Sequence, residues 1–103
     1  MHRRFEPNAA NELFLSERET SFPVLVVSLR DDLACMHFFP QEGHPGFQSI
    51  GTRRFGSFTF YGTDKQPFEI PAEAVISFDE AFRAAVEFCV TLALPQTLRW
   101  FEL

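Results

Sequence analysis

Apolar residues in this chain cluster in short runs separated by turn-forming residues, a pattern typical of β-strands. The run Phe22–Arg30 (FPVLVVSLR) is rich in β-branched residues and almost continuously apolar, which predicts a central strand buried on both faces. Asp31 and Asp32 form the following turn. Leu33–Phe39 (LACMHFF) then pairs back as the next strand. It ends before Pro40, because proline has no N–H to donate to a strand ladder.

Four further segments carry a weaker strand pattern. Glu12–Glu19 (ELFLSERE) is predicted to be the first strand, with a short helix as the alternative. Phe55–Tyr61 (FGSFTFY) alternates in the way of a half-buried strand. A turn at Gly62–Gln66 (GTDKQ) joins it to a short strand, Phe68–Ile70. The last segment, Thr97–Leu103 (TLRWFEL), also alternates and is predicted to be the final strand.

One helix is predicted with clear boundaries. Ser77 and Glu80 are spaced as a capping box, in which the hydroxyl bonds the Glu80 N–H and the carboxylate returns to the Ser77 N–H. The helix should run from Phe78 to about Leu92, because Pro95 prevents its continuation. The apolar residues at helical spacing that we expect to face the core are Phe78, Ala81, Phe82, Ala85, Cys89 and Leu92.

Together these elements predict an α+β fold. We expect a mostly antiparallel sheet of about five or six strands, with one long helix from the C-terminal half of the chain packed on one face. The length of 103 residues and the 46% hydrophobic content fit one domain over residues 1–103. Residues 1–10 are expected to form a loose N-terminal lead-in.

The aromatic content is unusual, because the chain has 14 Phe but only one Tyr and one Trp. A domain of this size is not expected to bury so many phenyl rings, so some should lie on a surface that a partner covers. Trp100 is expected to pack on the sheet and donate its indole N–H to a carbonyl.

The net charge of −5 excludes some classes of function. It argues against direct binding to nucleic acid, which needs a basic surface, and it suits a basic protein partner. No apolar run approaches the roughly 20 residues needed to span a bilayer. The N-terminal arginines are not followed by an apolar segment, so we expect neither a signal peptide nor a membrane partner, and a cytoplasmic location.

The two cysteines are predicted to be buried thiols, with a disulfide left open as an alternative. Cys35 and His37 point the same way from a predicted strand, and His44 or Cys89 could join them, but the spacing matches no strong zinc pattern. Neither cysteine lies beside a helix N-terminus or a cation that would lower its pKa. We therefore predict no catalytic, cofactor-binding or metal-binding residues, and keep a small Cys/His enzyme as an alternative.

The segment His37–Gly51 (HFFPQEGHPGFQSIG) is predicted to be a loop, because it contains two prolines and three glycines. Phe47 in its middle has two interpretations. Its ring either folds back against one end of the sheet or is presented to a partner by a stiff turn at low entropic cost. The string GFQSIG does not match the nucleophile elbow of serine hydrolases.

Four segments follow one another in an informative order. They are FPVLVVSLRDDLACMHFF (Phe22–Phe39), HPGFQSIG (His44–Gly51), EIPAEAVISFDEAFRAAVEF (Glu69–Phe88), and Pro95 followed by LRW (Leu98–Trp100). Together they resemble the first-numbered immunity-protein family of bacterial polymorphic toxin systems, over roughly residues 12–103. Leu92 departs from the family pattern, in which a glycine late in the helix could supply a left-handed cap.

The resemblance implies a non-enzymatic cytoplasmic antitoxin that binds and neutralises a cognate secreted toxin. It looks like the members that act on nucleic-acid deaminases, whose active-site mouth should be basic because the substrate is a polyanion. An acidic protein could block that active site or the substrate groove. The candidate partner-binding residues are Asp31, Asp32, Glu42, His44, Phe47 and Asp64.

The expected partner is thus a basic protein toxin, with no cofactor and no nucleic acid bound directly. We expect the free protein to be a monomer or a weak dimer. The remaining alternatives are the Cys/His enzyme and a generic protein-interaction module, dimeric through an edge strand such as Thr97–Phe101.

Overall fold

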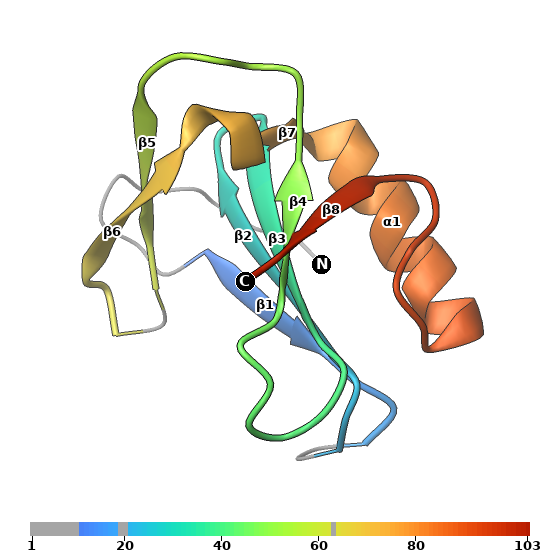
Figure 1. Cartoon of the computed structure of the whole chain (residues 1–103). Helices are drawn as coiled ribbons and strands as arrows, with labels where there is room; N and C mark the ends of the chain where they lie inside the picture. The colour runs from blue at the N-terminus through green and yellow to red at the C-terminus, as the bar shows by residue number, and fades with distance from the viewer. Residues whose placement is uncertain (1–10, 19–20, 63) are drawn as a thin grey trace.

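A computed structural model describes residues 11–18, 21–62 and 64–103 of the chain (Figure 1). Within these ranges the elements are, in order, β1 (Glu12–Leu15), β2 (Val24–Arg30), β3 (Leu33–Phe39), β4 (Phe47–Ile50), β5 (Ser57–Tyr61), β6 (Pro67–Pro71), the 3-10 turn η1 (Ala72–Ala74), β7 (Ile76–Ser77), α1 (Phe78–Thr91) and β8 (Arg99–Glu102).

The main sheet has six antiparallel strands in the order β1-β2-β3-β4-β8, with β7 also paired to β3. Because β2 occupies one edge of β3 along its whole length, β4 and β7 share the other edge. The β4 pairs lie at His37 and Phe38, and the β7 pairs lie at Leu33 and Ala34. A separate two-stranded sheet is formed by β5 and β6. The predicted α+β fold, an antiparallel sheet with one helix packed against it, is confirmed.

Both faces of the two central strands are covered, as the apolar run at Phe22–Arg30 predicts. On one face, residues of β2, β3, β7 and α1 form a core of Leu25, Val27, Leu29, Ala34, Met36, Phe38, Ile76, Ala81, Ala84 and Phe88. On the other face, residues of β3, of the β5–β6 hairpin and of the η1 segment with its C-cap form a second core of Cys35, Phe60, Ile70, Ala74 and Val75.

The helix begins and ends through identifiable caps. The Ser77 hydroxyl accepts from the Glu80 N–H at 3.1 Å, and the Glu80 carboxylate accepts from the Ser77 N–H at 3.1 Å, so the predicted capping box is confirmed. At the other end Leu92 adopts the left-handed conformation (φ 54°) that a glycine would take more readily. Its side chain packs against the core, so Leu92 closes the helix without a glycine.

The predicted buried stripe of the helix is wrong by part of a turn. Phe78, Phe82 and Cys89 are exposed, whereas Ala84 and Phe88, outside the predicted stripe, are buried. The physical reason is close packing on the sheet. Small alanines let the helix approach, and the Phe88 ring meets the Phe38 ring edge-on with centroids 6.1 Å apart.

Several element boundaries also differ from the prediction. The first strand ends at Leu15 rather than at Glu19, and the helical alternative for this segment is wrong. The segment His37–Gly51 is not a loop throughout, because β4 begins at Phe47. The Trp100 indole N–H donates to the Pro95 carbonyl at 2.8 Å, as expected. The lead-in predicted for residues 1–10 lies outside the described residues.

The GFQSIG string joins three elements. The buried Ser49 hydroxyl accepts from the Met36 N–H of β3 at 3.1 Å and donates to the Ala74 carbonyl of η1 at 2.7 Å. Two residues on, the Gly51 N–H donates to the Glu73 carbonyl at 2.6 Å. A Cβ atom at Gly51 would collide with the Val75 carbonyl oxygen, so only glycine permits this approach. We refer to the Ser49 and Gly51 contacts as the β4–η1 joint.

The β4–η1 joint makes a prediction for stability. Ser49→Ala should lower the free energy of unfolding by about 2 kcal/mol, because it leaves the buried Met36 N–H and the Ala74 carbonyl without partners. Ser57→Ala is the matched control, since that exposed hydroxyl bonds only Glu69, and it should change stability by less than about 0.5 kcal/mol. Urea denaturation measures both; equal effects would contradict the role assigned to Ser49.

Candidate partner-binding surfaces

The six residues predicted to bind a partner do not form one surface. The two ends of β3 separate them: Asp31 and Asp32 precede it in the β2–β3 turn, whereas the loop carrying Glu42 and His44 follows it. Figure 1 shows this loop and the β2–β3 turn at opposite ends of the long strands. Asp64 lies elsewhere again, exposed in the β5–β6 turn.

Phe47 packs against the protein itself. Its ring stacks on the His44 ring with centroids 5.3 Å apart and lies 6.1 Å from the Phe38 ring in the helix-side core. His44 is held in turn by Glu102, whose carboxylate is 3.1 Å from its Nε2, and by the Gly46 N–H, which donates to Nδ1 at 2.8 Å. The fold-back interpretation of Phe47 is therefore the one the structure adopts.

A different feature stands out on α1. Phe78, Phe82, Val86 and Val90 are 42%, 60%, 49% and 80% exposed. Their spacing of four residues places them in one row along the helix, and the Phe78 and Phe82 rings stack with centroids 6.5 Å apart. We call this row the helix ridge. Large exposed apolar side chains in a contiguous row mark interaction sites more often than single ones do.

Three carboxylates lie at the first turn of α1, beside the Phe78 end of the helix ridge. Asp31, Asp32 and Asp79 line a hollow of about 420 Å³ together with Ser77 and Phe78. The Phe78 N–H donates to the Asp32 carbonyl at 2.8 Å, which fixes the turn against the helix. Within residues 11–18, 21–62 and 64–103, none of the three carboxylates takes part in a side-chain hydrogen bond or an ion pair. Their charge is therefore not neutralised by a partner within these residues.

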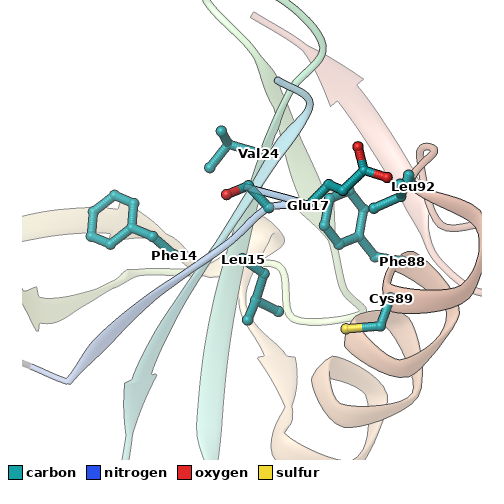
Figure 2. A pocket seen from close by; sticks show the side chains of 8 residues that line it. Phe14, Leu15, Glu17, Val24, Phe88, Cys89 and Leu92 are labelled. Carbon is teal, nitrogen blue, oxygen red and sulfur yellow. The ribbon is translucent and has the colours of Figure 1, made fainter. Parts of the chain in front are cut away.

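A second hollow opens between the sheet and the C-terminal half of α1 (Figure 2). It has a volume of about 780 Å³ and is lined by Phe14, Leu15, Ser16, Glu17, Val24, Phe88, Cys89 and Leu92. In Figure 2, Leu15 of β1 and Cys89 of α1 face each other across this hollow, and Phe14 points away from the helix. Its lining is largely apolar, so it has little of the polar chemistry that would fix a small ligand.

The sheet face away from α1 is covered only in part by the β5–β6 hairpin. A groove of about 400 Å³ there is lined by Glu12, Phe14, Val26, Ser28, His37, Phe39, Pro45, Phe68 and Leu103. Burial lowers the pKa of His37, and the His37 Nε2 atom lies 3.1 Å from the Gln48 side-chain nitrogen. His37 is thus held as a neutral hydrogen-bonding group at the base of an aromatic groove.

The environment of Cys35 does not favour nucleophilic chemistry. Burial raises the pKa of the Cys35 thiol to about 12, so it stays protonated at neutral pH. The prediction that both thiols are buried is wrong for Cys89, which is exposed, and the disulfide alternative is also wrong because both cysteines are free.

Among the described residues, no group of three or more His, Cys, Asp or Glu side chains could hold a metal ion. No described helix is long and apolar enough to cross a membrane.

Residues 2–102 match the model of the family described as immunity protein Imm1. The chain belongs to this family. No curated protein matches the chain. Membership in the Imm1 family confirms the resemblance drawn from the motif order and identifies the protein as an immunity protein, whose partner is a cognate toxin. Immunity proteins of this kind are generally non-catalytic.

Sequence reasoning missed the helix ridge although its signal is present in the sequence. The helix carries two apolar rows: Ala81, Ala84 and Phe88 form one, and the helix ridge forms the other. Only one flank of a helix can face the sheet at a time. When the first row packs on the sheet, the second row points away from it. Their negative charge identifies Asp31 and Asp32 as candidate partner-binding residues, but only the fold shows that they lie beside Phe78.

Thiol reactivity tests the two cysteine environments. In the native protein a thiol-reactive dye such as Ellman's reagent should modify Cys89 and spare Cys35, because Cys35 is fully buried and protonated. Cys89→Ser should then react with no dye until denaturant is added, whereas Cys35→Ser should react as the wild type does. Rapid native labelling of the Cys89→Ser variant would contradict the assigned burial.

The lowered pKa of His37 predicts a pH dependence of stability. Below about pH 6.5, the ordinary histidine pKa, His37 of the unfolded chain takes up a proton more readily than His37 of the folded chain. The free energy of unfolding should therefore decrease as the pH is lowered through this range. The slope from this one group is at most about 1.4 kcal/mol per pH unit. His37→Gln should flatten the fall between pH 7 and 5.5, while His44→Gln should retain it. Urea denaturation across this pH range measures both; identical slopes in the two variants would rule out the assignment.

Proposed function

We propose that the protein protects its own cell by binding a secreted nucleic-acid deaminase in the cytoplasm and covering that toxin's active site or substrate groove. Membership in the Imm1 family is the observation that carries the proposal. The charge and geometry of the protein support the two finer parts of the proposal, namely the class of toxin and the way it is blocked. A stoichiometric inhibitor needs a surface that fits the toxin, and it needs no chemistry of its own.

The charge balance supports a toxin that handles nucleic acid. The chain has 14 acidic and nine basic residues, and the side-chain carboxylates of Asp31, Asp32 and Asp79 have no partner among the described residues. A nucleic-acid enzyme carries a basic surface where it binds the phosphate backbone. An acidic protein competes for that surface and is drawn to it by long-range attraction, which raises the association rate.

A deaminase is a suitable target for inhibition by occlusion. Such enzymes act on a base that is displayed in a deep pocket beside a zinc ion and a glutamate. Blocking the entrance excludes a polynucleotide even when no group of the inhibitor reaches the zinc. The proposed mechanism therefore requires affinity and fit only.

Cytotoxicity tests the proposed function. Cells that express the toxin encoded beside this gene should survive when this protein is co-expressed and die when it is absent. Cys35→Ala should protect as well as the wild type, provided circular dichroism shows that it folds, because protection depends on binding. In vitro, toxin-catalysed deamination of an oligonucleotide should fall linearly with added protein and reach zero near one equivalent.

Two results would separate the parts of this proposal. Equal killing with and without the protein would refute its role as the antitoxin of that toxin. Protection against a toxin that deaminates no nucleic acid would leave the immunity function standing and refute the deaminase assignment.

A further inference from the structure

We infer that the helix ridge, Phe78, Phe82, Val86 and Val90, is the surface that contacts the toxin, and that it fits an apolar groove flanked by lysine or arginine at one end. This inference rests on the proposed function and adds to it the location of the interface and the chemistry of the partner surface.

The first argument is the burial that the helix ridge still lacks. Its two phenyl rings stack on each other and on nothing else among the described aromatic residues. All four side chains are exposed on a helix whose opposite flank is fully used by the core. Covering side chains of this size removes apolar surface from water, at roughly 25 cal/mol per Å². Successive members of the row are four residues apart and so are neighbours on the helix surface, as are the i and i+4 anchors of a helix that binds in a groove.

The second argument is charge complementarity. The carboxylates of Asp31, Asp32 and Asp79, which have no partner in the part of the chain that the structure describes, lie around Phe78 at the first turn. The last turn of α1 carries no basic residue. The other two acidic residues of α1 are used internally, Glu80 in the capping box and Glu87 as acceptor for the Gln96 and Thr97 N–H groups. Arg83 is the one basic residue of the helix. The net charge at the Phe78 end is therefore negative and calls for cations on the partner.

The same charges disfavour a second copy of this chain as the occupant. A two-fold dimer through the helix ridge would place the acidic end of one helix either against its equivalent or against a last turn without cations. Neither arrangement neutralises the carboxylates. The groove on the opposite sheet face is a weaker candidate, because its lining of aromatic residues, Glu12 and His37 defines no comparable partner charge.

Rigidity is the third argument. The ridge stands on a helix that is capped at its start by Ser77 and Glu80 and packed on the sheet through Ala81, Ala84 and Phe88. The bond from the Phe78 N–H to the Asp32 carbonyl holds the acidic turn in place. Both the apolar and the charged parts are thus fixed before binding, which reduces the entropy lost on association.

The experiment compares two phenylalanines with the same exposure. Phe82 on the ridge and Phe101 on β8 are each 60% exposed. Phe101 pairs across the strands with Gln48, which pairs with His37, so it lies on the sheet face away from α1. Phe82→Arg should weaken binding to the purified toxin roughly 30-fold or more, whereas Phe101→Arg should change the dissociation constant less than about threefold. Thermal unfolding checks that both variants fold.

A charge experiment tests the partner chemistry separately. The double variant Asp32→Lys and Asp79→Lys should slow association by roughly tenfold at low salt and reduce its salt dependence, because attraction to a basic surface is lost. The control is Glu42→Lys with Asp64→Lys, which makes the same charge change at two exposed residues that acidity also nominated for partner binding but that lie in other loops. If the ridge is the interface, this variant should leave the rate nearly unchanged.

Each outcome decides between the proposals. Wild-type protein that neither binds nor protects against the toxin refutes the proposed function, and the ridge assignment falls with it. If the wild type binds the toxin and Phe82→Arg binds it equally well, the ridge assignment alone is overturned. Loss of binding in Phe101→Arg, or in the Glu42 and Asp64 control, while Phe82→Arg still binds, would in addition place the interface elsewhere. A wild-type dimer that Phe82→Arg converts to a monomer without loss of protection shows a second copy on the ridge and also overturns it.

Discussion

The structure depends on how the second edge of β3 is shared. β4 pairs with it only at His37 and Phe38 and then diverges, and the Ser49 hydroxyl takes over by binding the Met36 N–H and the Ala74 carbonyl. Gly51 lets the chain approach η1 closely enough for its N–H to reach the Glu73 carbonyl. These contacts hold η1 so that β7 can pair with the start of β3, and α1 begins at the next residue. The buried Ser49 hydroxyl and the missing side chain of Gly51 thus help to fix where α1 begins on the sheet.

Local patterns in the sequence predict those parts of the fold that depend on local interactions. The β2 run is almost continuously apolar because both of its faces are covered, and the capping box forms from residues three apart. β4 and β7 could not be predicted in this way. Each is short, and each is defined by a partner far along the chain. Pro45 and Gly46 indicate a loop correctly up to their own positions, but no local signal shows that the loop ends there.

The candidate site shows a similar division. Asp31 and Asp32 follow from acidity and turn chemistry, but acidity alone nominates Glu42 and Asp64 equally, and the fold separates these residues. Helical periodicity identified Phe78 and Phe82 as apolar positions and assigned them to the core. The rotation of the helix about its axis decides which apolar row is buried, and that rotation depends on the small Ala81 and Ala84 side chains that face the sheet. A sequence pattern with two apolar rows is compatible with either choice.

For an inhibitor of a toxin, an exposed apolar row and unpaired carboxylates do different work. The apolar row would contribute the free energy that holds a complex together once it has formed. It gives little specificity, because many apolar grooves could accept it. The carboxylates contribute less to the lifetime of the complex and more to how fast it forms and to which partner is accepted, because an apolar groove without cations would leave Asp32 and Asp79 desolvated and unpaired. Speed matters for an antitoxin, since a toxin molecule that stays free does its damage before binding equilibrium is reached. Placing both features on one capped helix and the turn bonded to it gives a surface on which attraction by charge already orients the apolar contact.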